Sequence, residues 1–420
     1  MNNENALAVF YKEVLIGTLR LDETGRMIFD YSPGWIDTPS AFPISRSIPL
    51  DGSYKRGVKD HAFFANLLPE ADVRETLCRF YGISLSNDFG LLRKIGGECA
   101  GALSLFEEGT APVSEGSYRQ VTEEELSTAV ATKTASKRLI PDRRVRFSLA
   151  GGQDKWPILF ENGKLYLPEG AAASSHILKF DSLRFKGTGW NEAYVSFLAR
   201  KLGLPAVEVR PFQGYSLIER YDRKRTQERI VERLHQEDFC QALGLPANSK
   251  YESEGGPSFN QCLDLVRRAG SLPAIDSMNL IRWHIANVVF GNADGHAKNL
   301  SLLYEGRQCR LAPFYDLVCT GIYEGISRDL AMAVGKEHDP GQVRKRDWET
   351  LAENAGIRPR VVFSLLEEMT AKLSNNLHSL TREFSVSFGN HPVIDRIRVH
   401  IRDQVRRTRS LAFENLKDEA

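Results

Sequence analysis

The chain has 420 residues, 42% hydrophobic and 26% charged, a composition typical of a folded protein with more than one hydrophobic core. Lysine and arginine total 55 against 54 acidic residues, so no overall charge favours nucleic acid, and six cysteines without Cys-x-x-Cys spacing argue against a zinc site or a disulfide framework. The sequence shows neither a signal-peptide plan nor an apolar run approaching the roughly 20 residues of a membrane span, which predicts a cytoplasmic protein.

Short apolar runs separated by turns fill the first hundred residues. Runs at 7–11, 14–19 and 27–31 predict a small antiparallel sheet. A helix is expected from Pro69 through Tyr81, and another strand at 101–106. The stretch 107–124 is acidic and contains glycine and proline, which predicts a linker. Residues 1–110 are therefore predicted to form an N-terminal β-rich subdomain.

Residues 111–222 are predicted to form a second, strand-rich part. The strongest local signal is Asn162-Gly163, because both positions of this hairpin turn tolerate positive φ. A helix is expected at 191–202. The predicted strands are 146–149, 157–160, 164–167, 175–180, 207–210 and 215–221.

Helical patterns dominate beyond residue 235, so residues 223–420 are predicted to form a helical part. One hairpin, 300–304 with 308–311, interrupts them. A strand-rich half ahead of a helix-rich half predicts an α+β protein with a bilobed, protein-kinase-like fold. The predicted helices are 236–243, 259–269, 277–290, 348–355, 360–380 and 393–415.

Candidate catalytic residues lie in one short segment. Asp294 is followed five positions later by Asn299, and then by Tyr315-Asp316. A kinase uses one Asp to accept the proton of the attacking hydroxyl, and an Asn and a second Asp to hold the metal on the phosphates. His-Arg before Asp294 and Phe-Gly after Asp316 are both missing, which argues against an ordinary eukaryotic-type kinase. The alternative is a plain turn.

A glycine-containing loop and a lysine strand are the candidate phosphate-binding features. Glycines let backbone amides approach phosphate oxygens, and lysines add positive charge. Lys179 ends an apolar strand, and Glu192 on the next predicted helix is its candidate ion-pair partner. The alternatives are a simple turn and an edge-strand lysine facing water. The loop residues are Ala150, Gly151, Gly152, Gln153, Asp154 and Lys155.

Three further groups of residues are open to two interpretations. Residues Glu219, Arg220 and Tyr221 end the strand run, where a kinase hinge would meet adenine through its backbone; the alternative is a surface strand end. His296 and Lys298 are candidate γ-phosphate contacts, or a buried structural histidine and a solvated lysine. Six arginines near the C-terminus form either a solvated helix face or a contact with an acidic partner or DNA. These are Arg396, Arg398, Arg402, Arg406, Arg407 and Arg409.

Taken together, these motifs resemble the HipA-like serine/threonine kinases, the toxins of bacterial toxin–antitoxin pairs. The resemblance covers nearly the whole chain, and its motifs occur in order. Trp156 departs from the smaller or aliphatic residue that is common at this position beside the loop. The matching segments are 63–70, 146–155, 175–179, 235–244, 250–252, 255–257, 291–299 and 311–316.

The resemblance implies a role for each matching residue. Asp294 is similar to the family's catalytic base, Asn299 and Asp316 to its Mg2+ ligands, and Lys179 to its phosphate-pairing lysine. Residues 150–155 resemble the ATP loop and 219–221 the hinge. Tyr315, beside the second metal ligand, is a further candidate cofactor-binding residue.

Ser148 resembles the family's autophosphorylated serine. A phosphate there would repel the ATP phosphates, eject the loop and silence the kinase.

The family also implies partners. Its members phosphorylate translation proteins, notably aminoacyl-tRNA synthetases such as glutamyl-tRNA synthetase, and pair with a helix-turn-helix antitoxin that binds operator DNA. Two other functions stay open from the sequence. One is a small-molecule kinase of the aminoglycoside or choline type, and the other is a mainly non-catalytic co-repressor that braces a DNA-binding partner.

Overall fold

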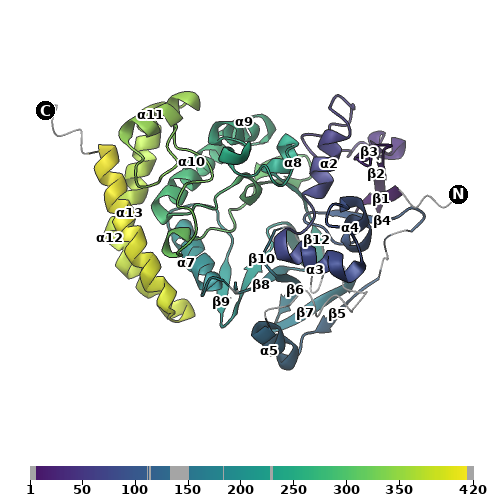
Figure 1. Cartoon of the computed structure of the whole chain (residues 1–420), viewed down its shortest axis with the longest axis horizontal. Coiled ribbons are helices and arrows are strands. Elements are labelled where there is room, and N and C mark those ends of the chain that lie inside the picture. Colours follow the sequence, from purple (N-terminus) through teal and green to yellow (C-terminus); the bar gives the residue numbers. More distant parts are fainter. Residues whose placement is uncertain are drawn as a thin grey trace. The chain divides into compact units, whose positions relative to one another are not determined.

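The chain divides into two compact units in the computed structural model, which describes residues 6–110, 112, 115–132, 151–182, 184–227 and 230–413 (Figure 1). The first unit contains Met1–Phe180, Leu217–Ala247 and Ser301–Cys309, and the second contains Asp181–Ser216, Asn248–Leu300 and Arg310–Ala420. All six cysteines are buried thiols. Among the described helices, none combines the length and apolar character that a membrane crossing requires.

The N-terminal part of the first unit is the predicted antiparallel sheet. Its strand order is β3-β2-β1-β4, and Leu19 of β2 lies opposite both Leu7 of β1 and Phe29 of β3. These residues share one core with Phe63, Phe64 and Leu92 from the neighbouring helices. The strands are β1 (Ala6–Tyr11), β2 (Val14–Leu21), β3 (Met27–Tyr31) and β4 (Leu103–Glu107).

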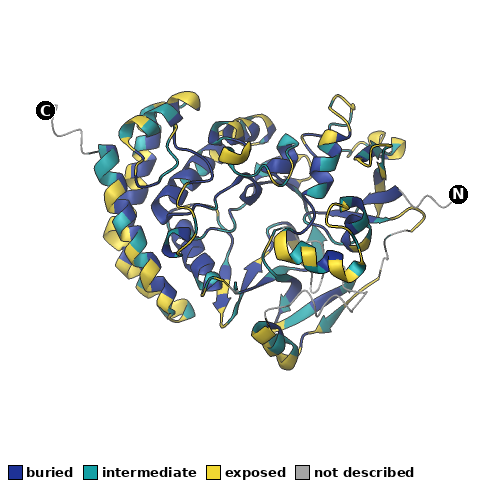
Figure 2. Ribbon diagram, viewed as in Figure 1, coloured by how far each residue is buried: buried dark blue, intermediate teal, exposed yellow. Residues whose placement is uncertain are grey.

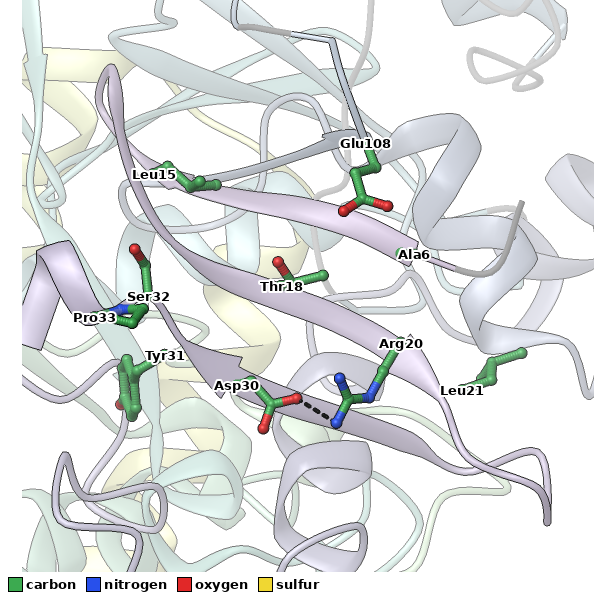
Figure 3. A pocket seen from close by; sticks show the side chains of 10 residues that line it. All are labelled: Ala6, Leu15, Thr18, Arg20, Leu21, Asp30, Tyr31, Ser32, Pro33 and Glu108. Carbon is green, nitrogen blue, oxygen red and sulfur yellow. Dashed lines mark ion pairs between the residues drawn. The ribbon is translucent and has the colours of Figure 1, made fainter. Parts of the chain in front are cut away.

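The four helices of this part are α1 (Pro33–Ile36), α2 (Val58–Ala65), α3 (Ala71–Tyr81) and α4 (Asp88–Ile95). Helix α3 confirms the helix predicted through Tyr81. A groove of about 670 Å³ crosses the outer face of β2 and β3, and the Arg20–Asp30 ion pair of 2.7 Å spans it (Figure 3). None of the predicted site residues lines this groove.

A second sheet in the first unit has the order β5-β7-β6-β8-β10. Asn162 (φ 50°) and Gly163 (φ 75°) form the tight turn between β6 and β7, which confirms the predicted hairpin. Its elements are β5 (Gly116–Gln120), α5 (Glu123–Thr132), β6 (Lys155–Glu161), β7 (Lys164–Gly170), β8 (His176–Phe180) and β10 (Tyr215–Glu219), whose residues from Leu217 belong to this unit.

The linker predicted at 107–124 is wrong in part, because it contains β5. This strand pairs with β7 over Gly116–Gln120, and its short, polar sequence gives no local sign of that partner. The strand predicted at 146–149 lies outside the described residues.

Residues 223–247, predicted to begin the helical part, instead add strands to the first unit. They form β11 (Arg223–Gln227), β12 (Ile230–Arg233), β13 (His235–Asp238) and the short helix α8 (Phe239–Leu243). The helix predicted from Gln236 is wrong over its first three residues. They pair with β14 (Ser301–Glu305), which is followed by β15 (Gln308–Leu311). The sequence does not indicate this strand, because its residues are polar although most of them are buried.

Glu237 of β13 is fully buried within a cluster of donors. Its Oε2 lies 2.5 Å from the Ser45 hydroxyl, and its Oε1 accepts from the Arg46 backbone N–H at 3.1 Å and from the Tyr304 hydroxyl. Burial, only partly offset by these hydrogen bonds, raises the pKa of Glu237 to about 7.

This raised pKa predicts a pH-dependent stability. The folded state holds a proton that the unfolded chain releases above its ordinary pKa of 4.5, so the stabilisation is complete below that pKa and is lost as pH rises through about 7. As the pH rises from about 5 to about 8, wild type loses this stabilisation and Glu237→Gln does not. The free energy of unfolding of Glu237→Gln minus that of wild type is therefore expected to rise by about 2–3 kcal/mol over this range. Denaturant titrations at both pH values measure it. Glu305→Gln, exposed on β14, is expected to show no such gain.

The second unit is mainly helical and confirms the remaining predicted helices. Helices α12 and α13 lie side by side, with their exposed residues on the outer face and their buried residues toward α7 and α10 (Figures 1 and 2). Phe384 of α12 packs against Tyr194 and Phe197 of α7. The elements are α7 (Thr188–Lys201), β9 (Val209–Phe212), α9 (Phe259–Ala269), α10 (Pro273–Phe290), α11 (Lys345–Asn354), α12 (Pro359–Phe388) and α13 (Pro392–Phe413).

The arginines of α13 do not all face solvent. Arg396 donates to the Ile322 carbonyl, and Arg409 donates to the Thr370 hydroxyl at 3.1 Å, so both contact their own unit. Arg402 and Arg406 are exposed and share Asp403 at 3.1 and 3.8 Å. Contact of this helix with DNA therefore stays a prediction that concerns its outward arginines.

Candidate active site

The predicted catalytic loop follows α10 in the second unit. Gly291 ends the helix with φ 65°, a left-handed conformation that favours glycine, and a Cβ there would overlap the His400 imidazole. Beyond it, the Asn292 backbone N–H donates to the Asn287 carbonyl at 2.9 Å, and the Asn292 Oδ1 accepts from the Asp294 N–H at 3.1 Å. The Asn292 side chain therefore holds the backbone N–H of Asp294.

A buried threonine braces the same loop from a second direction. The Thr320 hydroxyl accepts from the Ala293 N–H at 2.8 Å and donates to the Gly291 carbonyl at 2.9 Å. Gly295 lies so close to Asn287 that an added Cβ would meet its amide nitrogen at 2.5 Å. A loop with this many local bonds presents its side chains in one geometry, as catalysis requires.

The Asp294 carboxylate is held at one oxygen and open at the other. The Tyr251 hydroxyl donates to Asp294 Oδ1 at 2.5 Å, and His296 Nε2 lies 3.7 Å from the same oxygen. The side chain nevertheless remains 48% exposed, so a substrate hydroxyl can reach it. The sequence predicts no role for Tyr251, although this residue lies in the matching segment 250–252.

Asn299, a predicted metal ligand, is buried and its side-chain amide is fixed by the loop. It ends a short 3-10 helix (η2, Ala297–Asn299), its backbone N–H donates to the His296 carbonyl at 2.9 Å, and its Nδ2 donates to the Asp294 carbonyl at 2.7 Å. Because the amide nitrogen is used in this way, the amide oxygen is the atom left for a ligand. An amide oxygen is a hard donor of the kind that Mg2+ binds.

Asp316 lies on a segment that is fixed at both ends. Before it, the Phe314 N–H donates to the Pro205 carbonyl at 2.7 Å, and the Phe314 carbonyl accepts from the Val207 N–H at 2.9 Å. After it, the Cys319 backbone exchanges two hydrogen bonds of 2.8 and 2.9 Å with the Asn191 side chain of α7.

The backbone of Asp316 is itself unusual. Its φ is 53°, one of four positive values among the described non-glycine residues, and such conformations often mark functional sites. The Tyr315 hydroxyl donates to the Lys298 carbonyl at 2.8 Å, which joins this segment to the catalytic loop beside Asn299. The structure thus links the segments of both predicted metal ligands, Asn299 and Asp316, within one unit.

His296 and Lys298, the two other predicted polar groups of the loop, are only 6% and 7% exposed. The alternative of a solvated lysine is therefore wrong. The His296 ring meets the Tyr251 ring edge-on, with centroids 5.1 Å apart. A cationic lysine buried in a catalytic loop suits a site that receives phosphate groups.

The predicted nucleotide loop belongs to the first unit, and Ala150 and Ser148 lie outside the described residues. The Gly151 carbonyl accepts from the Glu70 N–H at 3.2 Å, which joins the loop to the end of the segment 63–70. Gln153 Nε2 donates to the Phe180 carbonyl at 2.7 Å, and the Asp154 carbonyl accepts from the Phe180 N–H at 3.1 Å. Gly152 lies between these anchored residues.

Two lysines lie directly opposite each other on β6 and β8. Lys155 pairs with Lys179 in the antiparallel register, so their side chains share one face of the sheet, and Lys179 is only 6% exposed. Trp156 and Leu178 occupy the other face, where Trp156 packs edge-on against Phe180 with centroids 5.1 Å apart. Opposed like charges destabilise a sheet. Two lysines on one face are a source of positive charge of the kind that binds nucleotide phosphates.

The side chains of the predicted hinge, Glu219 to Tyr221, are used partly within the fold. Arg220 is buried and binds Asp222 through two hydrogen bonds of 2.9 and 2.7 Å, and its backbone N–H donates to the Ser175 carbonyl at 3.0 Å. The Tyr221 hydroxyl donates to Gln236. Glu192 is buried on α7 in the second unit, and its pairing with Lys179 stays a prediction.

Comparisons with known proteins show which family the chain resembles. The HipA N-terminal domain matches residues 7–106, and the HipA-like C-terminal domain matches residues 147–377. The putative kinase Y4mE of Sinorhizobium fredii is 38% identical over 360 residues, which cover 84% of this chain and 86% of that protein. The serine/threonine-protein kinase toxin HipA of Shewanella oneidensis is 30% identical over 380 residues, 86% of each chain.

A solved structure is similar over the full length. It is the complex of HipA and HipB from Shewanella oneidensis MR-1 with its operator DNA, and it matches with a TM-score of 0.83 and 26% identity, over 99% of this chain and 100% of that one. This likeness confirms the predicted α+β, kinase-like fold class. The chain therefore belongs to the HipA family of serine/threonine-protein kinase toxins.

Proposed function

We propose that the protein transfers the γ-phosphoryl group of ATP to a serine or threonine hydroxyl of a protein substrate, with Asp294 as the base. The observation that carries this proposal is the Asp294 carboxylate, held at one oxygen by Tyr251 and open to solvent at the other. In the reaction, the carboxylate accepts the proton of the substrate hydroxyl while the hydroxyl oxygen bonds to the γ-phosphorus, the bond from that phosphorus to the bridging oxygen breaks, and ADP leaves.

Asn299 and Asp316 are the proposed Mg2+ ligands, through the amide oxygen and the carboxylate. The Asn299 side chain is turned with its oxygen available, and Tyr315 ties the segment of Asp316 to the catalytic loop. When bound, Mg2+ would neutralise charge on the phosphates. We further propose that residues 150–155, Lys179, His296 and Lys298 bind the phosphates, and that the backbone of residues 219–221 binds adenine.

The three parts predicted from the sequence carry different proposed roles. Residues 1–110 support the nucleotide loop, as the bond between Glu70 and Gly151 illustrates. Residues 111–222 bind the nucleotide. Residues 223–420 supply the base and the metal ligands.

Ser148 is the proposed site of autophosphorylation, beside the ATP loop. A phosphate there would place close to two negative charges next to the loop that receives ATP phosphates, so the modified enzyme would be inactive. We propose that the toxin phosphorylates a translation protein, an aminoacyl-tRNA synthetase such as glutamyl-tRNA synthetase. A helix-turn-helix antitoxin would neutralise it, and the pair would repress its operon at operator DNA, as the Shewanella complex of HipA, HipB and operator DNA suggests.

Intact-mass measurement after incubation with ATP and Mg2+ tests this proposal. Wild type is expected to gain one phosphate, Ser148→Ala to gain none, and Ser117→Ala, exposed on β5, to behave as wild type. Labelled ATP added with a cell lysate then reports transfer to other proteins, where Ser148→Ala is expected to remain active because it cannot silence itself.

Two results would count against it. A phosphate retained in Ser148→Ala would show that another residue is the acceptor. No label on the chain or on any lysate protein, with label appearing on metabolites instead, would favour a small-molecule kinase.

A further inference from the structure

We propose that Tyr251 is a positioning residue for the catalytic base, an inference that rests on the proposed role of Asp294. Its hydroxyl lies 2.5 Å from Asp294 Oδ1, which is at the short end of the distances found for hydrogen bonds between a hydroxyl and a carboxylate. The bond joins residues 43 positions apart in the chain. It fixes one carboxylate oxygen, so that the other is presented to the substrate hydroxyl.

The backbone around Tyr251 is held firmly enough for such a role. Its carbonyl accepts from the Glu254 and Gly256 N–H groups at 3.0 and 2.8 Å, which closes a tight turn. A Cβ on Gly256 would lie 2.6 Å from the Tyr251 carbonyl, so this turn requires glycine. The close approach of the Tyr251 carbonyl is thus a physical reason for a glycine at position 256 of the segment 255–257.

Both neighbours of Tyr251 are anchored as well. The Lys250 carbonyl accepts from the Ala297 N–H at 3.3 Å, which attaches the segment to the catalytic loop itself. On the other side, the Glu252 N–H donates to the Ala331 carbonyl at 3.0 Å, and Glu252 Oε2 accepts from the Ala333 N–H at 2.7 Å. The phenol is thus placed by bonds that do not involve its own hydroxyl.

The phenol ring is also oriented by its packing. The buried His296 imidazole meets it edge-on at 87°, and the Lys250 ammonium lies 5.8 Å from the ring centroid. This packing fixes the ring plane and therefore the direction of the hydroxyl. The short bond to Asp294 then restricts the carboxylate rotation, which would otherwise spread the base over several rotamers.

Tyr251→Phe removes only the hydroxyl and tests the proposal. We expect kcat to fall by about 10- to 100-fold, because a misaligned base loses the attack geometry, while KM for ATP stays unchanged. The matched control is Tyr194→Phe, which removes a buried hydroxyl bonded to Thr381 at 2.7 Å on α7 and is expected to keep the wild-type kcat. Thermal melting of both variants reports on folding.

A double-mutant cycle separates positioning from a general structural effect. In the Asp294→Asn background, Tyr251→Phe is expected to leave the residual rate unchanged, because the base that it aligns is already gone. An equal fall in both backgrounds would overturn the proposal. So would an unchanged or raised kcat in Tyr251→Phe alone, and a rise would instead indicate that the phenol competes with the substrate hydroxyl.

The same experiments distinguish this inference from the proposed function. If Asp294→Asn retains full activity, the assignment of the base itself is wrong. If Asp294→Asn is inactive while Tyr251→Phe equals wild type in kcat, only the inference about Tyr251 fails.

Discussion

Asp294→Asn is expected to lower kcat about a thousandfold while leaving the fold intact. The amide cannot accept the proton of the attacking hydroxyl, and general-base catalysis contributes about 10²–10⁴-fold to such reactions. The Asn oxygen can still accept the hydrogen bond from Tyr251, so the loop geometry is expected to persist. Transfer of labelled phosphate to Ser148 or to a lysate protein measures the rate, and the melting temperature reports on folding.

A matched control is Asp264→Asn on α9, whose side chain is 60% exposed and pairs only loosely with Arg267 at 3.7 Å. It makes the same chemical change in the same unit and is expected to leave kcat and the melting temperature unchanged. A wild-type kcat in Asp294→Asn would show that Asp294 is not the catalytic base. A loss of the same size in both variants would show that the effect is not specific to the catalytic loop.

Asp222→Asn is expected to cause the largest loss of stability, about 3–5 kcal/mol, because two buried arginines lose their nearest carboxylate and retain the more distant Glu98, at 3.8 and 3.3 Å. The Asp222 side chain is 5% exposed, and those of Arg220 and Arg223 are 2% and 1% exposed. Asp222 binds Arg220 at 2.7 Å and Arg223 at 2.8 Å, and its Oδ2 accepts from the Gly101 N–H at 2.8 Å. Denaturant titration near neutral pH measures the difference.

The charges of this cluster also fix a pH dependence. Burial acts to raise the pKa of Asp222, but the Arg220 and Arg223 guanidinium groups outweigh it and hold the pKa well below its usual range. Burial, followed by the Arg220 charge, lowers the pKa of Arg223 to about 9. Since the folded pKa of Asp222 is depressed, its stabilisation is present above the unfolded pKa and is lost as pH falls below it. The variant is therefore expected to lose this part of the acid dependence.

Asp30→Asn provides the control for Asp222→Asn. Asp30 also pairs with two arginines, Arg20 and Arg56, but its side chain is 34% exposed in the groove of Figure 3. Surface pairs contribute about 0–1 kcal/mol, so the expected loss is small. Equal losses in the two variants would contradict the importance of burial for the Asp222 cluster.

The parts of the fold that could be predicted are those with local signals. Asn162-Gly163 specifies its own hairpin, and the long helices show their apolar period without reference to the rest of the chain. Strands β5 and β13 could not be predicted, because their short polar sequences become strands only through distant partners, β7 and β14. The buried Glu237 in particular looks like a surface residue until its partners, Ser45 and Tyr304, are known.

The candidate site divides in the same way. Asp294, Asn299 and Asp316 lie close together in the sequence, so their spacing alone suggested a common task. Tyr251 could not be assigned, because its contact with Asp294 depends on a turn and a loop that meet only in the folded unit. Arg220 was predicted at the hinge from its position, but only the structure shows its side chain bound to Asp222.

The register of β6 and β8 sets the positions of two cationic side chains at once. Because Lys155 lies opposite Lys179, the same backbone pairing that builds the sheet also places both lysines on one of its faces. A polyanion bound on this face would therefore be held by groups whose spacing the sheet itself determines. Added multivalent anions are expected to raise the melting temperature of the wild type, and to raise it less in Lys155→Gln.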